Sequence, residues 1–309
     1  MPAFEVSRSI EIAVPPETVY DGVADLGTWT KWSPWLGIDP DAVVTVSENA
    51  NSVGAIYRWK GEVVGEGELE HLKLDRPRQI SDEIRFTKPF KSKSKVGFHF
   101  EATDVGTRVT WRMQGSLPWF LFWMRANMQT LIGMDYDRGL KMLREYLETG
   151  EVLSKIEVQG VQSVSPIDVY GVSDAAPLNH MGPAMERVFS TATEKLKQAD
   201  VSLDAAMISV YHPCDLKQNE FRFTGGYAVS NDDGMAAGLT HCHLSAGNAL
   251  CVRHIGSYEN LGNAWSGAYQ YARYKKLKVL RQDAYEIYRN DPATTPPRDR
   301  ITDIYLPVK

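Results

Sequence analysis

The residue with the clearest chemical potential is a single acid among aromatic side chains. Glu286 lies in the segment 284–288 (AYEIY), between Tyr285 and Tyr288. Alternation along a strand puts Glu286 on the face opposite Tyr285 and Ile287, and we expect that face to point toward helices. Burying an unpaired carboxylate is costly, so such a group is more often functional than structural. The alternative is a solvated glutamate at one end of a sheet.

An apolar, aromatic surrounding would give this carboxylate two uses, which the sequence does not separate. It would attract a flat cation by charge pairing and cation–π contact. It would also raise the pKa of Glu286, so that the group could act as a general acid or base near neutral pH. The aromatic candidates for a ligand site around Glu286 are Tyr170, Tyr211, Trp265, Tyr269, Tyr288 and Phe189, each of which could equally be ordinary core.

A second group with chemical potential is the segment His241-Cys242-His243. Alternation places both imidazoles on one side of a strand, a spacing that metal sites use. No second pair of ligands follows nearby in the sequence, although His254 and His180 could approach in space. We therefore favour a metal-free strand and expect neither a metal nor a cofactor.

Composition excludes several classes of protein. The chain has 309 residues, of which 43% are hydrophobic and 24% charged, which is typical of globular proteins and favours two domains. The formal charge of −5 offers no basic surface for nucleic acid. The run Lys91, Lys93 and Lys95 alternates along an expected strand and is better explained as a solvated face. We expect no direct binding of nucleic acid.

Cysteine usage and hydropathy indicate a location in the cytoplasm. Cys214, Cys242 and Cys251 are odd in number and lack CxxC spacing, so neither a disulfide framework nor a cysteine-rich zinc site is expected. Residues 1–14 have a strand pattern without the features of a signal peptide. The apolar stretch 117–134 is interrupted by polar residues and is too short to span a bilayer. We therefore expect no membrane insertion.

The elements of the first half follow one another in a defined order. Residues 4–14 alternate, and Pro15-Pro16 open a short helical stretch. After Pro118, apolar residues from Met124 to Leu147 recur at three- and four-residue steps, which predicts a long amphipathic helix. Between them, turn residues separate alternating segments that predict an antiparallel meander: 43–48, 55–61, 66–74, 79–87, 96–103 and 108–114.

Two segments carry a family resemblance for this half: IEIAVPPETVYDGVADLGTWTKWSPW (10–35) and IGMDYDRGLKMLREYLE (132–148). About residues 3–149 resemble the START-related SRPBCC superfamily of helix-grip, polyketide-cyclase-like proteins, which includes lipid carriers, hormone receptors and aromatase/cyclases. The resemblance implies a sheet wrapped around the long helix with an apolar cavity between them. His71 and His99 stand without a neighbouring acid or nucleophile, so we expect no catalytic residue here. Residues that could line the cavity, or simply fill the core, are Trp29, Trp32, Trp35, Trp59, Trp111 and Met128.

The second half contains an internal repeat. His180-Met181-Gly182 and His254-Ile255-Gly256 each precede a helical segment, which is followed by two strands. The closing strands match Thr224 with Thr302 and Tyr227 with Tyr305, and Glu286 stands where the first copy has Ser209. Each copy therefore has the order strand, helix, strand, strand. Two copies would place two helices on one face of a shared antiparallel sheet, with a pocket along the pseudo-twofold axis.

Three segments of this half, HIGSYENLGNAW (254–265), DAYEIYRNDPATTPP (283–297) and RITDIYLPV (300–308), resemble the GyrI-like domain. This effector-binding module also ends AraC- and MerR-type regulators, and the resemblance covers about residues 155–309. It implies that Glu286 matches the family's central acid. That acid attracts cationic aromatic drugs in multidrug-sensing members, and it assists water addition in a subgroup that hydrolyses cyclopropanoid natural products. The helix-turn-helix of such regulators is missing, so a regulatory protein partner stays possible whereas DNA binding does not follow.

We therefore expect an α+β protein with a helix-grip ligand-cavity domain at 1–152 and a duplicated β-α-β-β GyrI-like domain at 153–309. The favoured function is a small-molecule sensor or sequestering module for flat, apolar, cationic aromatic compounds. The alternatives are a hydrolase with Glu286 as its catalytic residue, and a cyclase or lipid-handling role in the first domain. Binding is favoured because one carboxylate suffices for it, whereas catalysis normally needs partner groups.

Overall fold

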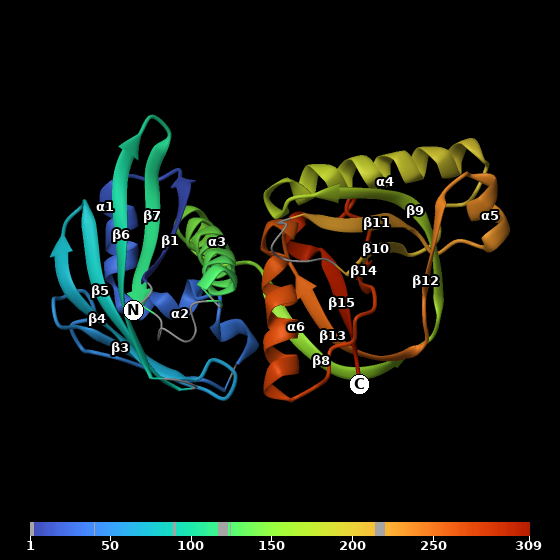
Figure 1. Cartoon of the computed structure of the whole chain (residues 1–309). Coiled ribbons are helices and arrows are strands. Elements are labelled where there is room, and N and C mark those ends of the chain that lie inside the picture. Colours follow the sequence, from blue (N-terminus) through green and yellow to red (C-terminus); the bar gives the residue numbers. More distant parts are fainter. Residues whose placement is uncertain (1–2, 40, 89–90, 117–122, 124, 214–219) are drawn as a thin grey trace. The chain divides into compact units, whose positions relative to one another are not determined.

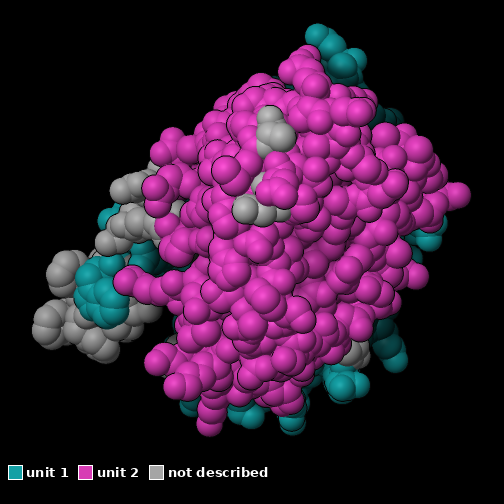
Figure 2. Space-filling model, turned by 90° about the vertical axis from the view of Figure 1, so that its right-hand side faces the viewer, with its two compact units in different colours: residues 1–153 teal, residues 154–309 magenta. Residues whose placement is uncertain are grey.

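A computed structural model describes residues 3–39, 41–88, 91–116, 123, 125–213 and 220–309. The chain divides into two compact units, residues 1–153 and 154–309 (Figure 2). Each unit has one antiparallel sheet with helices, so the predicted α+β class is confirmed. Met124 of the expected long helix and Cys214 lie outside the described residues. None of the helices in the described part of the chain is long and apolar enough to cross a membrane.

The first unit is built on a seven-stranded antiparallel sheet in the order β1-β7-β6-β5-β4-β3-β2 (Figure 1). Strands β2 to β7 are neighbours in the chain and in the sheet, which is the expected meander, and β1 joins β7 at the edge. The expected solvated lysine face is found on β6, where Lys93 is exposed and pairs with Glu83 at 2.6 Å. The strands are β1 (Ala3–Ile12), β2 (Val43–Val46), β3 (Ile56–Lys60), β4 (Glu66–Asp75), β5 (Gln79–Lys88), β6 (Ser92–Thr103) and β7 (Gly106–Ser116).

Three helices, α1 (Pro16–Ala24), α2 (Trp29–Trp32) and α3 (Arg125–Thr149), accompany this sheet. The long helix α3 buries Tyr136, Leu140 and Leu143, which recur at the helical spacing expected from the sequence. It packs along β1. The helix therefore lies against the edge of the sheet that is formed by β1.

The tryptophans of this unit pack on one another. Trp111 on β7 stacks on Tyr136 of α3, with ring centroids 3.9 Å apart. Trp29, Trp32 and Trp35 each contact Trp111 at centroid distances of 6.4, 5.9 and 5.9 Å. Trp29, Trp32 and Trp111 are at most 6% exposed. These side chains form the aromatic core between the sheet and α3.

His71 corrects an expectation, because it does have an acidic partner. Its Nδ1 lies 2.6 Å from Asp82 Oδ1, across the β4–β5 pair, and both side chains are fully buried. Its Nε2 lies 2.9 Å from the carbonyl oxygen of Ala24, the last residue of α1. A carbonyl only accepts, so Nε2 carries a proton and donates it. The imidazole thus ties the end of α1 to the sheet, whereas His99 is exposed and lies 3.2 Å from Glu101.

The second unit holds an eight-stranded antiparallel sheet in the order β12-β9-β11-β10-β14-β15-β13-β8 (Figure 1). The expected copies are visible as β9-α4-β10-β11 and β13-α6-β14-β15, which meet at the β10–β14 pair. The strands are β8 (Lys155–Val164), β9 (Ile167–Ala176), β10 (Met207–Tyr211), β11 (Phe221–Tyr227), β12 (Thr240–Leu244), β13 (Gly247–Ile255), β14 (Ala284–Tyr288) and β15 (Ile301–Val308). The helices are α4 (Met181–Gln198), α5 (Asn231–Ala236) and α6 (Gly262–Tyr274).

This sheet is strongly curved. β8 leads within two residues into β9, although the two strands lie at or next to opposite ends of the strand order, and the same holds for β12 and β13. Helices α4 and α6 lie on the outer side of the curve (Figure 1). The inner face therefore packs on itself, with Val210, Tyr285, Ile287 and Tyr305 in one buried cluster. Both faces of β14 are buried, so Ile287 faces a second core and not solvent.

Two details of the expected repeat are wrong. Thr224 lies on the inner face, whereas Thr302 pairs with Tyr288 on the helix face. Tyr227 packs under α4 and Tyr305 packs in the inner cluster, so these matches are out of step by one residue. A slip of one residue turns a side chain to the other face of a sheet.

The two matched histidines also differ in position. His180 directly precedes α4, as expected. His254 lies inside strand β13, and α6 begins only at Gly262. The strand ends at Ile255, and the next residue, Gly256, has a φ of +133°, a backbone conformation that glycine adopts without strain. His254 is therefore a side chain of the sheet and not a residue of a helix terminus.

Candidate functional site

Glu286 lies at the centre of the second unit. It is directly paired with Ser209, across the β10–β14 contact where the two copies meet. Its side chain has no exposed surface. Tyr285 and Ile287 point into the inner cluster, so alternation directs Glu286 to the helix face, as its place in the strand predicts.

Neutral groups alone hold the carboxylate. Trp265 Nε1 of α6 donates a hydrogen bond to Oε1 at 2.5 Å, and the Tyr288 hydroxyl donates one to Oε2 at 2.8 Å. The Tyr211 hydroxyl forms a third hydrogen bond. Among the described residues, no cationic side chain forms an ion pair with Glu286. The site is a buried acid with three dipoles around it and no counter-charge.

The two tyrosines are related by the repeat. Tyr211 follows Ser209 by two residues on β10, and Tyr288 follows Glu286 by two residues on β14. Tyr211 therefore projects from the same face as Ser209, and Tyr288 from the same face as Glu286. Because β10 and β14 are antiparallel, the two tyrosines lie on opposite sides of the carboxylate. Tyr288 also contacts Ser209 Oγ at 2.9 Å. Because Tyr288 donates its proton to Glu286, this contact is a hydrogen bond donated by Ser209.

Aromatic rings surround this polar centre. Trp265 meets Tyr211 edge-on, with ring centroids 5.0 Å apart. Tyr288 meets Phe189 of α4 at 5.6 Å and Tyr258 at 5.5 Å, again near edge-on. Sequence reasoning missed Tyr258, although it lies within the quoted segment 254–265. Its position in the turn before α6 gave no periodic signal.

Two of the expected aromatic residues lie elsewhere. Tyr170 on β9 is separated from β14 by strands β11 and β10, and its ring stacks on His241 at 4.8 Å. Tyr269 lies one helical turn beyond Trp265 on α6 and is 52% exposed. The structure thus brings Tyr211, Trp265, Tyr288 and Phe189 together at Glu286, and it leaves Tyr170 and Tyr269 outside this buried group.

Burial sets the protonation of the site. It raises the pKa of Glu286, and the hydrogen bonds from Trp265, Tyr288 and Tyr211 oppose that rise only in part. Burial and the charge of Glu286 hold the pKa of both tyrosine hydroxyls well above 10. The hydroxyls therefore remain protonated donors. The carboxylate is the group whose charge a ligand can change.

A second polar group lies two strands away on the same face. His254 on β13 pairs with Thr302, which pairs in turn with Tyr288. The imidazole is fully buried, and within the described structure neither of its nitrogens has a hydrogen-bond partner. Burial lowers the pKa of His254 to about 4, so the ring is neutral and offers one donor and one acceptor.

Comparison with known families divides the chain at the same place. Residues 161–309 match the family model described as the GyrI-like small molecule binding domain. Residues 3–148 match the model described as polyketide cyclase / dehydrase and lipid transport. Both predicted resemblances are thereby confirmed. No curated protein matches the chain.

Solved structures each resemble about half of the chain. Protein MLL2253 from Mesorhizobium loti is 16% identical over 47% of this chain and 96% of its own, with a TM-score of 0.37. The Aha1 dimer from Colwellia psychrerythraea is 19% identical over 47% and 97%, with a TM-score of 0.35. SAV2435, solved with bound tetraphenylphosphonium, is 17% identical over 50% and 94%, with a TM-score of 0.38.

Proposed function

We propose that this chain, a fusion of a polyketide-cyclase-like domain with a GyrI-like small-molecule-binding domain, binds aromatic cations at Glu286 as a sensor or sequestering protein. The family match supports binding of a small molecule by the second domain. The cationic, aromatic character of the ligand follows from the residues around Glu286.

The missing counter-charge of Glu286 carries this proposal. A carboxylate in a low-dielectric site is stabilised far more by a cation than by dipoles alone. Trp265, Tyr288 and Tyr211 orient both oxygens of the carboxylate, but as neutral groups they do not balance its negative charge. A ligand that brings one positive charge completes the pair. A neutral ligand of the same shape gains nothing from it.

The rings define the shape of the ligand. Faces of Trp and Tyr attract cations, by roughly 0.5–2 kcal/mol for each contact depending on desolvation. Tyr211 and Trp265 lie on one side of the carboxylate, and Phe189 and Tyr258 contact Tyr288 on the other. A delocalised cation carried on aromatic rings fits both features.

Titration calorimetry with tetraphenylphosphonium and a flat cationic dye tests the charge pairing. Glu286→Gln keeps the size and one oxygen acceptor but removes the charge. We expect it to weaken cation binding about tenfold or more, since such a pair contributes on the order of 1–3 kcal/mol. Glu186→Gln, on the exposed side of α4, is the matched control. Equal affinity of wild type and Glu286→Gln would refute the role of this carboxylate.

Hydrolysis is the second candidate function, and the environment of Glu286 supports it. Its raised pKa suits a group that takes a proton from water while the hydroxide adds to a strained ring. The Tyr211 and Tyr288 hydroxyls, both expected near Glu286 from the sequence, are proton donors beside it. A product one water heavier than an electrophilic substrate, formed by wild type and not by Glu286→Gln, would make the protein a hydrolase.

For the first domain we propose an apolar ligand, with a cyclase or lipid-handling role as the alternative. The family match supports an apolar ligand for this domain. The rings packed around Trp111 occupy part of the space between the sheet and α3, so a ligand there would lie against them. Quenching of tryptophan emission by a fluorescent fatty acid tests it. Retained quenching in Trp111→Phe but not in Trp111→Ala would place the ligand against this ring.

The proposed setting is the cytoplasm, without contact to DNA and with a regulatory protein as a possible partner. The formal charge of −5 and the free thiols of Cys242 and Cys251 support this setting. A gel-shift experiment with nonspecific duplex DNA at low salt should show no complex.

A further inference from the structure

Three side chains of types that can ligate metals meet at one edge of the second domain's sheet, far in strand order from Glu286. Asp168 lies on β9, and His241 and His243 lie on β12, the first strand of the order. Asp168 is directly opposite His243, and His241 is opposite Tyr170 two residues further along. The strand register therefore supplies the acid that the sequence segment 241–243 lacked.

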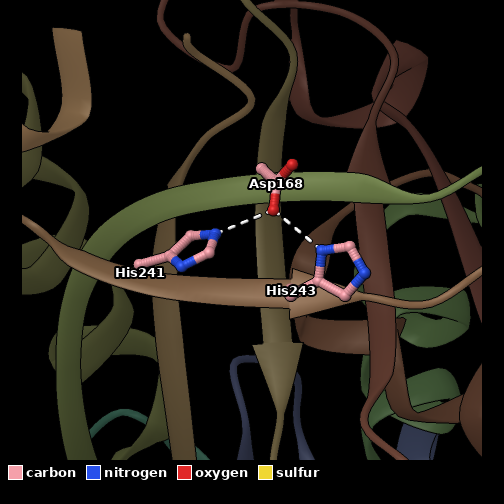
Figure 3. A group of neighbouring side chains, drawn as sticks. All are labelled: Asp168, His241 and His243. Carbon is pink, nitrogen blue, oxygen red and sulfur yellow. Dashed lines mark hydrogen bonds and ion pairs between the residues drawn. The ribbon is translucent and has the colours of Figure 1, made fainter. Parts of the chain in front are cut away.

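The three ligand atoms already converge (Figure 3). His241 Nε2 and His243 Nδ1 each lie 2.8 Å from the same atom, Asp168 Oδ1. One ligand atom from each residue lies within 4.8 Å of the others. Around a tetrahedral Zn²⁺ with bonds of about 2.0–2.2 Å, neighbouring ligand atoms are roughly 3.3–3.5 Å apart. The two separations of 2.8 Å are about 0.5–0.7 Å shorter than this spacing, and all three side chains are exposed.

We infer that Asp168, His241 and His243 form a binding site for a divalent transition-metal ion of the Zn²⁺ class. Two imidazoles and one carboxylate suit Zn²⁺ and its first-row neighbours, whereas Mg²⁺ and Ca²⁺ prefer all-oxygen sites. The side chains are 46–53% exposed, so an ion at this edge keeps positions for water or for a further ligand. The site is independent of the proposed function at Glu286.

The surroundings fix one of the imidazoles. The ring of His241 stacks on Tyr170, with an interplanar angle of 18°. Tyr170 is itself buried beneath α5, since a Cβ at Gly234 of that helix would lie 2.0 Å from the Tyr170 ring. Outer contacts of this kind orient metal ligands and strengthen binding. Tyr170, which does not join the Glu286 group, thus has a place in this site.

The test is calorimetric titration of the full chain, freed of metal with a chelator and carrying no affinity tag, with ZnCl₂. We expect one equivalent to bind, and each of Asp168→Asn, His241→Asn and His243→Asn to weaken binding at least about tenfold. His180→Asn, an exposed histidine of the same domain, should leave it unchanged. MgCl₂ in large excess should not compete.

Imidazole nitrogen shifts provide the second measurement. Zn²⁺ should shift Nε2 of His241 and Nδ1 of His243, the atoms that face Asp168. Binding that survives in His243→Asn, or that falls equally in His180→Asn, would mean adventitious surface binding and overturn the inference. Absence of any saturable binding by the wild type would overturn it as well.

Discussion

At the scale of single residues, burial of the Glu286 carboxyl group affects the stability of the folded protein. Burial raises its pKa, so the folded protein holds a proton at Glu286 more tightly than the unfolded chain does. The folded state is therefore penalised at pH values above the ordinary range of a glutamate. Glu286→Gln should raise the free energy of unfolding near neutral pH by on the order of 1 kcal/mol or more. Urea unfolding at pH 7.5 measures this, and a less stable variant would contradict it.

The raised pKa of Glu286 also determines how the affinity for a cationic ligand depends on pH. A cation favours the ionised carboxylate, so its affinity should fall as pH decreases through the raised pKa of Glu286. The fall should begin at a higher pH than an unperturbed glutamate would give. Calorimetry between pH 8 and pH 5 should show this slope in the wild type and no slope in Glu286→Gln. A pH-independent wild type would mean that the charge is not used.

His254 makes the stability of the protein depend on pH in the opposite direction, with a loss at acid pH. The pKa of His254 is about 4 in the folded protein and 6.5 in the unfolded chain. Above pH 6.5 the ring is neutral in both states, whereas between pH 6.5 and 4 only the unfolded chain takes up the proton. The folded state therefore loses stability as pH falls from 6.5 toward 4. That loss amounts to about 3 kcal/mol. His254→Phe should remove this acid sensitivity, and it should not destabilise the protein at pH 7.5, because two unpaired polar atoms disappear. Denaturation curves at pH 7.5 and 4.5 compare the two proteins.

At the scale of elements, the approach of α4 to β11 positions one wall of the site. A Cβ at Gly225 would lie 2.7 Å from Val188 and 3.2 Å from Phe189. Gly225→Ala should therefore push α4 outward, cost about 1–3 kcal/mol of stability and weaken cation binding through Phe189. Gly182→Ala, on the same helix with open space around it, is the control and should be neutral or slightly stabilising. Thermal unfolding and calorimetry of both variants test the contact.

At the scale of the whole molecule, each half completes its own sheet and its own core. The first sheet buries the cluster around Trp111, and the second buries an inner face as well as the helix face. Residues 1–153 and 154–309, produced as separate proteins, should therefore each fold cooperatively, and the second should keep its affinity for aromatic cations within about threefold. Calorimetric unfolding and titration of the two pieces, compared with the full chain, check this. Failure of 154–309 to fold alone would contradict it.

Features that depend on local periodicity could be predicted from the amino-acid sequence. The strand meander, the long helix ending near Leu147 and the duplicated order of the second half follow from repeats of two and of about 3.6 residues. The direction of Glu286 follows from the same alternation, because Tyr285 and Ile287 on either side had to point the other way. The family resemblances rested on these elements and on short segments within them.

Contacts between residues that are distant in sequence depend on how the strands assemble into a sheet. Strand pairing joined His71 to Asp82 and Asp168 to His243, although neither pair is close in sequence. The strand order carried Tyr170 away from Glu286. A single strand offers no information about its register with a neighbour, and a slip of one residue exchanges its two faces. Local pattern therefore fixed the direction of each side chain, and only the assembled sheet fixed its partners.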